Sequence, residues 1–311
     1  MSMTQVLPSV FPHKFSHLDK NNRIPYSETR TLCPNAKKNL HLGQIKLLYS
    51  ELLFLIKCSK PGDLVLYVGA ASGYHTGYLA RMFPELEFDL WDPGKFDIEL
   101  NDNINIYNEF FSDTSAEQYA KRKNKRLLYI CDIRSIEMGQ LTKAKDMEGS
   151  ENIVVDNMES QMRWAQIMKP AYAYLKFRLP YNVETFKYLT GQIYLQPYAP
   201  ISTESRLLTS DYDTEIEYDS VMFDEMLAWH NIYNRCKGEP WPDWEHLCLK
   251  YRIKNNWDNI FALTTLKIYL KQRNRLGTTR EEETDSIAKL FIDIIEYHRK
   301  RYGNKVMVVY Y

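Results

Sequence analysis

Residues 64–73 read LVLYVGAASG, a short apolar run that ends in a glycine-containing loop. Such a run predicts a strand of the buried parallel type, and residues 76–83 after the loop predict a helix. An amphipathic helix is expected just before the strand, at about residues 43–58. The two glycines, Gly69 and Gly73, allow a sharp turn and a close approach of the backbone to a ligand.

The same alternation of strand and helix continues along the chain. Strands are expected at residues 86–91, 104–107, 127–131 and 171–177, helices near 114–124 and 157–168, and closing strands near 193–196 and 204–209. This pattern predicts a Rossmann-like α/β fold with a doubly wound, mostly parallel sheet. We divide the chain into an N-terminal arm (1–40), an α/β domain (41–235) and a mainly helical C-terminal extension (236–311) packed on the same domain.

The charge of the chain is balanced overall but uneven along its length. The 311 residues contain 40 Lys+Arg and 40 Asp+Glu and are 44% hydrophobic, which excludes a disordered chain and a uniformly basic nucleic-acid binder. The net charge is +6 over residues 1–60, −9 over 61–120, +5 over 121–210, −7 over 211–250 and +5 over 251–311. The basic blocks predict a surface for a polyanion, unless they are simply solvated faces.

Cysteine usage and the N-terminus bear on the compartment. The five cysteines are scattered and form no C-x-x-C pair, which favours a reducing environment over a zinc ribbon or a disulfide framework. The first residues lack the order of a signal peptide, and the longest apolar stretch, Leu47–Ile56, is too short to span a bilayer. We therefore expect a soluble, cytoplasmic protein.

The glycine loop and the next strand end indicate a nucleoside cofactor. Asp92 follows the second strand, nineteen residues after Gly73, where its carboxylate can accept both ribose hydroxyls of an adenosine. The loop lacks the three-glycine dinucleotide pattern and the Gly-Lys-Ser/Thr of a phosphate loop, so S-adenosylmethionine fits better than a nicotinamide cofactor. A tight turn without a ligand is the alternative interpretation.

Charged residues near the expected strand ends add candidate chemistry. Lys176 lies in an otherwise apolar strand, where desolvation lowers the pKa of a lysine. Asp132 ends a central strand and Glu204 opens a later one. A surface lysine is the alternative interpretation for both lysines, and for Lys46, which lies in the first helix, it is the favoured one when that residue is taken alone.

Five separated motifs carry a resemblance to a known family. They are GQIKLL (43–48), LYVGxAxGxH (66–75), CDIRS (131–135), LKxRxP (175–180) and LQPYAP (195–200) with ExRLL (204–208). In this order and spacing they resemble the poxvirus-type cap-specific mRNA (nucleoside-2′-O-)methyltransferase, which is also the regulatory (small) subunit of the viral poly(A) polymerase. The resemblance covers roughly residues 20–235 and implies an S-adenosylmethionine-dependent methyltransferase fold for the α/β domain.

The resemblance assigns the catalytic roles. The family's Lys-Asp-Lys-Glu tetrad falls on Lys46, Asp132, Lys176 and Glu204. Lys176, with a depressed pKa, is the candidate general base for the ribose 2′-hydroxyl. Lys46 would lower that pKa and stabilise the developing oxyanion. Asp132 would orient Lys176 and itself lie near the sulfonium, and Glu204 would orient a lysine and the ribose.

The resemblance also implies the binding residues. Those for the cofactor are Gln44, Tyr67, Gly69, Gly73, Asp92, Phe111, Asp132 and Arg134, and those for cap and RNA are Tyr26, Arg178, Tyr181, Tyr198 and Asp224. The family holds the methylated guanine between two aromatic rings and reads its edge with carboxylates. Tyr181 matches one ring, whereas Ile201 takes the place of the other unless Tyr198 substitutes. Asp224 matches one acid, and Val183, beside Glu184, replaces the second.

The leading hypothesis is therefore a methyltransferase that uses S-adenosylmethionine to methylate the first transcribed nucleotide of capped viral mRNA. A non-catalytic, RNA-binding processivity subunit of a viral poly(A) polymerase is the alternative, although the complete tetrad favours catalysis. Expected partners are capped mRNA and the polymerase catalytic subunit as a heterodimer, without a membrane. The resemblance implies a location in the host cytoplasm, with packaging in the virion as a second location.

Overall fold

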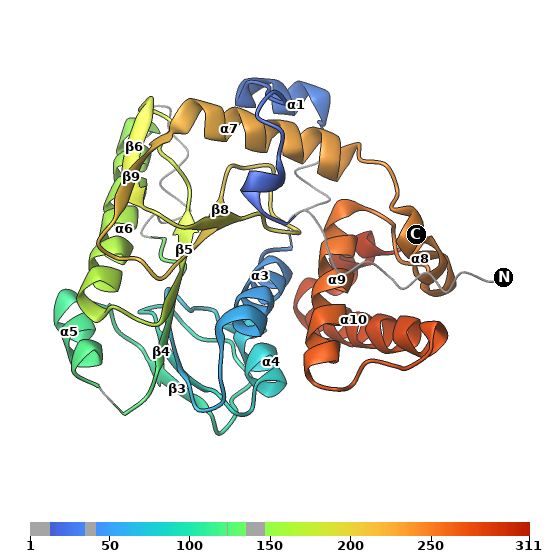
Figure 1. Cartoon of the computed structure of the whole chain (residues 1–311), viewed down its shortest axis with the longest axis horizontal. Helices are drawn as coiled ribbons and strands as arrows, with labels where there is room; N and C mark the ends of the chain where they lie inside the picture. The colour runs from blue at the N-terminus through green and yellow to red at the C-terminus, as the bar shows by residue number, and fades with distance from the viewer. Residues whose placement is uncertain (1–12, 35–41, 123, 135–146) are drawn as a thin grey trace.

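The computed structural model describes residues 13–34, 42–122, 124–134 and 147–311 (Figure 1). Much of the expected N-terminal arm, at residues 1–12 and 35–40, and Ser135 of the third motif lie outside these ranges. The described part of the arm contains 3₁₀ turns at Phe15–His17 and Tyr26–Glu28 and the short helix α1 (Thr29–Leu32).

A seven-stranded sheet forms the centre of the molecule. Its strand order is β3-β2-β1-β4-β5-β8-β7, and β1 to β5 run parallel, whereas β8 is antiparallel to both β5 and β7. The strands are β1 (Leu64–Val68), β2 (Glu87–Trp91), β3 (Ile104–Tyr107), β4 (Leu127–Cys131), β5 (Tyr172–Phe177), β7 (Gln192–Tyr194) and β8 (Ser205–Thr209). The predicted doubly wound, mostly parallel sheet is confirmed. All five residues of β1 are buried, as its uninterrupted apolar run requires.

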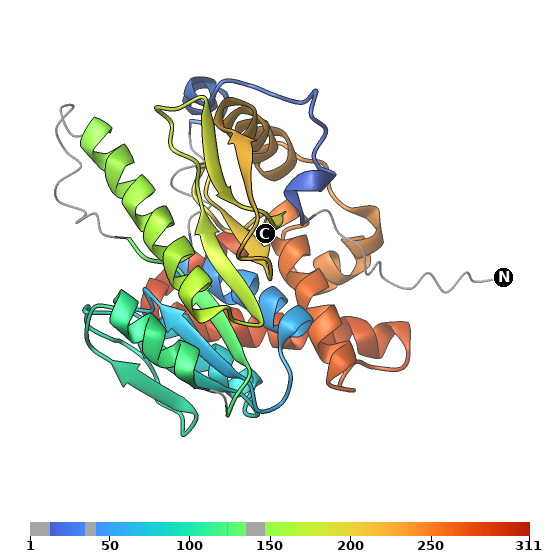
Figure 2. The same ribbon diagram turned by 60° about the vertical axis from the view of Figure 1, so that its left-hand side comes forward.

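Helices cover both faces of this sheet. On one side lie α3 (Gly43–Cys58) and α4 (Tyr74–Met82), and on the other α5 (Asp113–Lys121) and α6 (Met147–Met168), which pack on each other (Figures 1 and 2). Helix α6 begins ten residues before the predicted start at 157. The prediction missed these residues because the first turns are mainly polar and lack the apolar periodicity of a buried face. Helix α4 begins directly after Gly73, whose φ of 71° ends the loop.

A small ribbon of two antiparallel strands, β6 (Thr185–Leu189) and β9 (Glu215–Asp219), was not predicted. Its second strand has the sequence EIEYD, and acidic residues are depleted in strands. The pairing joins segments about thirty residues apart, so it follows from tertiary packing rather than from local preference.

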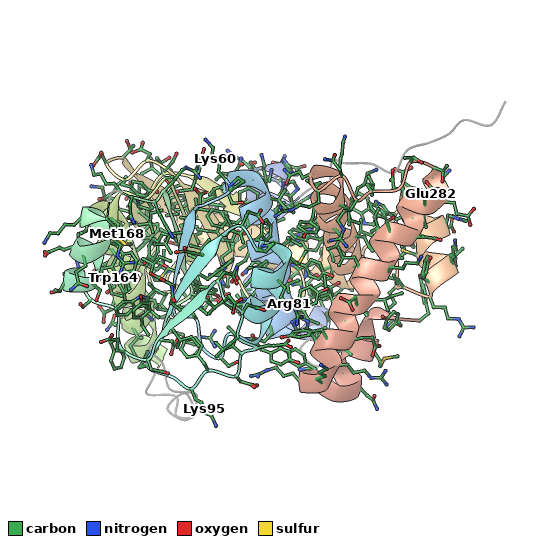
Figure 3. All side chains as sticks on the ribbon, turned by 90° about the horizontal axis from the view of Figure 1, so that it is seen from below. Lys60, Arg81, Lys95, Trp164, Met168 and Glu282 are labelled. Atoms are coloured by element: carbon green, nitrogen blue, oxygen red, sulfur yellow. The ribbon has the colours of Figure 1, made fainter. Side chains whose placement is uncertain are left out.

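The chain after β9 is mainly helical, as expected. Helix α7 (Ser220–Trp229) leads into a π-helical segment (His230–Cys236), followed by a 3₁₀ turn (Pro242–Trp244), α8 (Glu245–Tyr251), α9 (Trp257–Gln272), α10 (Arg280–Tyr302) and a final 3₁₀ segment (Gly303–Val309). Helix α9 packs on α3, and α10 packs on α9, so these helices form an outer layer beyond α3 and α4 (Figure 3). Across the described ranges, no helix combines the length and apolar character needed to cross a membrane.

Candidate active site

The candidate site lies at the carboxyl ends of β1 and β4, where the strand order reverses. The two strands are paired up to Val68 and Cys131, so Gly69 and Asp132 follow side by side, and the Asp132 amide donates to the Val68 carbonyl at 2.9 Å. Gly69 has a φ of 82°, and a Cβ there would lie 2.7 Å from the Asp132 carbonyl carbon. Only glycine allows this close approach.

The four predicted catalytic residues come together at this edge. Lys176 Nζ lies 3.0 Å from Asp132 Oδ1 and 3.4 Å from Glu204 Oε2. Lys46, from the first turn of α3, places its Nζ 2.5 Å from Glu204 Oε1. Residues up to 158 positions apart therefore form one continuous cluster of two amines and two carboxylates.

Arg206 is a fifth member of the cluster that the sequence reasoning placed in a motif but gave no role. Its side chain is 1% exposed, with Nη2 2.8 Å from Asp132 Oδ1 and 4.0 Å from Glu204 Oε1. Antiparallel pairing sets Arg206 opposite Lys176, so both side chains leave the same face of the sheet. That register would have identified Arg206 in advance, but it depends on the pairing of β5 with β8.

The electrostatics of the cluster follow from burial and mutual charge. Burial lowers the pKa of Lys46, against the opposing effect of the Glu204 and Asp132 charges. Burial alone would raise the pKa of Asp132, but Arg206 and Lys176 hold it well below its usual range. Lys176, Lys46 and Arg206 likewise outweigh burial at Glu204 and keep its pKa well below the usual range. Both carboxylates are therefore ionised and serve as fixed anions between cations.

Three of the residues expected around the cofactor follow the ends of the parallel strands β2, β3 and β4. Asp92 lies beyond the end of β2 and accepts hydrogen bonds from the amides of Ala71 (3.1 Å) and Gly94 (2.7 Å). Phe111 is 8% exposed and packs edge-to-face on Trp91, with ring centroids 5.3 Å apart. The side chain of Arg134 is 59% exposed, and its guanidinium lies 3.9 Å from Glu204.

Gln44 and Tyr67, which were also expected at the cofactor, belong to a hydrogen-bond network that is partly buried at Gln44 and buried at Tyr67. The Tyr67 hydroxyl donates to Glu51 Oε1 at 2.7 Å. His75 places Nε2 2.9 Å from Glu51 Oε2 and Nδ1 2.9 Å from Gln44 Oε1. Glu51 had no predicted role, because a glutamate within an apolar helix stretch gives no signal until its partners are known.

The loop has the features that an adenosine cofactor needs. The carboxylate of Asp92 retains lone pairs for ribose hydroxyls, because each of its oxygens accepts only one described bond. The Ser72 hydroxyl, inside the same loop, is buried and has no hydrogen-bond partner among the described residues. A buried hydroxyl without a partner is costly, and a polar ligand at the loop would satisfy it.

Three of the predicted cap residues, Tyr26, Arg178 and Tyr181, form a second cluster beyond β5. Tyr26 and Tyr181 stack with ring centroids 5.8 Å apart and an interplanar angle of 22°. The guanidinium of Arg178 lies 4.0 Å from the centroid of the Tyr181 ring. The segment carrying Tyr26 lies along α7 (Figure 1), where the Ile24 amide donates to the Glu225 carbonyl at 3.3 Å.

The aromatic partner of Tyr181 is thus Tyr26, and the suggestion that Tyr198 substitutes is corrected. Tyr198 is 3% exposed, its hydroxyl donates to Asn259 at 2.8 Å, and its ring lies against Tyr49, so it belongs to the core. Ile201 is also buried, and its carbonyl accepts from the Tyr26 hydroxyl at 2.8 Å. Ile201 therefore supplies no ring of its own, but its backbone carbonyl holds the Tyr26 hydroxyl.

The acidic side of this cluster is Asp224. Burial raises its pKa to about 6, although Thr203 and Arg178 act in the opposite direction. Its Oδ1 is buried without a hydrogen-bond partner among the described residues. The Thr203 hydroxyl also lies 3.0 Å from the Tyr181 hydroxyl, which links the acid to the ring. Val183, by contrast, is 36% exposed and offers no charge.

The chain is similar to known proteins over most of its length. Residues 12–240 match the family described as poly A polymerase regulatory subunit. Fowlpox virus cap-specific mRNA (nucleoside-2′-O-)-methyltransferase is 31% identical over 210 residues, which cover 58% of this chain and 65% of the relative. The myxoma virus (strain Lausanne) protein of the same name is 29% identical over 245 residues, 71% of this chain and 70% of the relative. The chain thus spans about two thirds of the length of these relatives.

Proposed function

The chain belongs to the poly(A) polymerase regulatory subunit family, and from this premise we propose that it is a cap-specific mRNA 2′-O-methyltransferase. In this proposal it moves a methyl group from S-adenosylmethionine to the ribose 2′-hydroxyl of the first transcribed nucleotide of capped mRNA. The relatives from fowlpox and myxoma viruses carry that activity in their names. Capped RNA is the substrate that this chain would share with them.

The observation that carries the proposal is the assembled tetrad with Arg206. Methyl transfer to a hydroxyl needs a base at the attacking oxygen and positive charge to stabilise the developing oxyanion. Lys176 is the candidate base, and its contacts with Asp132 (3.0 Å) and Glu204 (3.4 Å) hold the amine in place. The 2′-oxygen would gain the methyl group as the bond between that group and the sulfonium sulfur breaks, and its proton would pass to Lys176 Nζ, which must be the neutral amine to accept it. Lys46 and Arg206 supply the positive charge.

S-adenosylmethionine supplies an electrophilic methyl group on a sulfonium when it is bound. Asp92 would accept from the ribose hydroxyls, Phe111 would pack on the adenine, and Gln44 and Tyr67 would line the other end of the site. Asp132, ionised and held by Arg206, would lie near the sulfonium as a favourable anion. These positions follow the order of the strand ends, β1, β2 and β4, at one edge of the sheet.

The Tyr26–Tyr181 pair would hold the methylated guanine. A base between two rings requires centroids about 7 Å apart, twice a contact distance of ~3.5 Å. The rings stand 5.8 Å apart, so binding would separate them by about 1 Å. Asp224 would accept a hydrogen bond from the edge of the methylated base, and its ionised carboxylate would attract the positive charge of that base.

A second function, as a processivity subunit of a viral poly(A) polymerase, is favoured by the name of the matching family. It requires a surface for the polymerase and for RNA, and it does not require the tetrad. Both functions are compatible in one chain. Elongation assays with a viral poly(A) polymerase catalytic subunit, with and without this protein, would test it.

The enzymatic proposal is tested by methyl transfer from labelled S-adenosylmethionine to capped RNA. We expect transfer by the wild-type protein and loss of at least about a hundredfold in Lys176→Ala, the typical contribution of a general base. Lys187→Ala is the matched control, because this lysine lies on β6 with 72% of its side chain exposed. Absence of transfer by the wild-type protein would overturn the enzymatic proposal and favour the processivity function.

A further inference from the structure

The first turn of α3 is capped by a residue from the far end of the chain. The residue before α3, Leu42, has no side-chain acceptor for the free amides of the first turn. Instead, the Gln44 amide donates to the hydroxyl of Tyr302, at the last residue of α10, over 2.7 Å. The two residues are 258 positions apart. This turn carries both Gln44 and Lys46, so the contact holds a segment that belongs to the candidate site.

The side chain of Gln44 is held just as firmly. Its Oε1 accepts from the backbone amide of His75 at 3.1 Å and lies 2.9 Å from His75 Nδ1. A backbone amide only donates, so the oxygen must face His75, and Nδ1 must carry a proton. His75 Nε2 then meets Glu51, which accepts from Tyr67. One chain of hydrogen bonds, partly buried at Gln44 and buried from His75 onward, thus joins Tyr302 to both Gln44 and Tyr67.

Helix α10 also contacts the residue that directly follows the glycine loop. Tyr74 follows Gly73, and its hydroxyl donates to the Tyr297 carbonyl at 3.0 Å. In return, the Tyr297 hydroxyl donates to the Tyr74 carbonyl at 3.2 Å, and the two rings lie 4.9 Å apart. Arg81, labelled in Figure 3, lies where α4 faces α10 and is 5.0 Å from the Tyr297 ring centroid. The last turns of α10 therefore contact both the first turn of α3 and the first turn of α4, which directly follows the glycine loop.

We propose that Tyr302 is a positioning residue for the methyl-donor site, acting through the Gln44 amide at the start of α3. The inference rests on the proposed function, since it takes the donor site to be that of S-adenosylmethionine. It gives a role to α10, which lies outside the family match at residues 12–240. In this proposal α10 completes the methyl-donor site, and the hydrogen bond from the Gln44 amide to the Tyr302 hydroxyl links the helix to that site.

The test measures binding of S-adenosylhomocysteine by calorimetry, without any methyl transfer. Tyr302→Phe removes one hydroxyl and should raise the dissociation constant about fivefold, the factor for one ordinary hydrogen bond. The KM for S-adenosylmethionine should rise by the same factor, while kcat at saturating donor changes less than about twofold. In a Gln44→Ala background, Tyr302→Phe should have no further effect on binding.

Tyr78→Phe is the matched control. The Tyr78 hydroxyl donates to Asp293 of α10 at 2.5 Å, so its loss weakens the docking of the same helix without removing the Gln44 contact. We expect S-adenosylhomocysteine affinity to be unchanged in this variant.

The outcomes separate the inference from the function. Equal affinity of Tyr302→Phe and wild type would overturn the inference, as would an equal loss in Tyr78→Phe or full additivity with Gln44→Ala. Wild-type protein that binds S-adenosylhomocysteine but transfers no methyl group would refute only the proposed activity, and the binding comparison would still decide the inference. Wild-type protein that fails to bind it would overturn both.

Discussion

Replacing Arg206 by methionine should expose how much of the site depends on one buried charge. Methionine occupies a similar volume but removes the guanidinium that lies 2.8 Å from Asp132 Oδ1 and donates to the Cys131 carbonyl at 3.2 Å. The arginine is 1% exposed, so water does not replace these bonds. Removing one partner of a buried ion pair costs about 3–5 kcal/mol of unfolding free energy. For a chain of 311 residues, this corresponds to about 5–8 °C in melting temperature.

The loss should depend on pH, because it acts through Asp132. Burial opposes ionisation of this carboxyl, but Arg206 and Lys176 hold its folded-state pKa below the ordinary value of 3.8. Ionised Asp132 therefore contributes stability at neutral pH that disappears as the pH falls below 3.8 through the folded-state pKa. The difference in unfolding free energy between wild type and Arg206→Met should have its full value near neutral pH and should become smaller as the pH falls below 3.8.

Urea unfolding at neutral and acidic pH measures the stability, and methyl transfer measures the function. We expect kcat to fall about 10- to 100-fold, because Asp132 and Glu204 lose the cation that places them. Lys267→Met is a suitable control: it removes another buried cation, 2.8 Å from Glu283 between α9 and α10, and should cost stability without lowering kcat. A stability difference that is the same at both pH values would refute the electrostatic reasoning and indicate lost packing alone. An unchanged kcat would refute the role in the site.

Three further predictions address the surroundings of the site. The affinity for a cap analogue, measured by fluorescence titration, should rise as the pH increases through about 6, where Asp224 ionises. Asp224→Asn should flatten this pH profile, and a flat profile of the wild-type protein would exclude Asp224 as the residue that recognises the methylated guanine. Gly69→Ala should cost about 2–4 kcal/mol in chemical unfolding, because it adds a clash to an unfavourable φ. Gly62→Ala, at a φ of 87° but in open space, should cost clearly less, and equal costs would show that the clash is unimportant. RNA affinity should fall steeply with salt if the basic blocks at residues 1–60 and 121–210 share a face, whereas a flat salt response would exclude that face.

The positions of the parallel strands along the chain were predictable, because each strand ends in its own local signal. The run at residues 64–68 is apolar throughout and stops at a glycine, and β3 and β4 have the predicted bounds. Parallel strands present their carboxyl ends at one edge of the sheet, which predicts that Asp92 and Asp132 lie near the glycine loop. The ribbon of β6 and β9 was missed for the opposite reason, since its second strand is acidic and gains its stability from a distant partner.

The sequence by itself determined the identity of the reactive groups and the fold that gathers them. Four charged residues, a glycine loop and an acid at the next strand end are chemical facts of the chain, and their spacing follows from α/β periodicity. The tertiary structure alone decided which groups touch. Arg206 enters the cluster because an antiparallel register sets it opposite Lys176, Tyr26 meets Tyr181 across 155 positions of sequence, and Tyr302 caps a helix that begins near the other end. Such contacts depend on directions and distances that local preferences do not encode, because a hydrogen bond is made over about 3 Å whatever the separation along the chain.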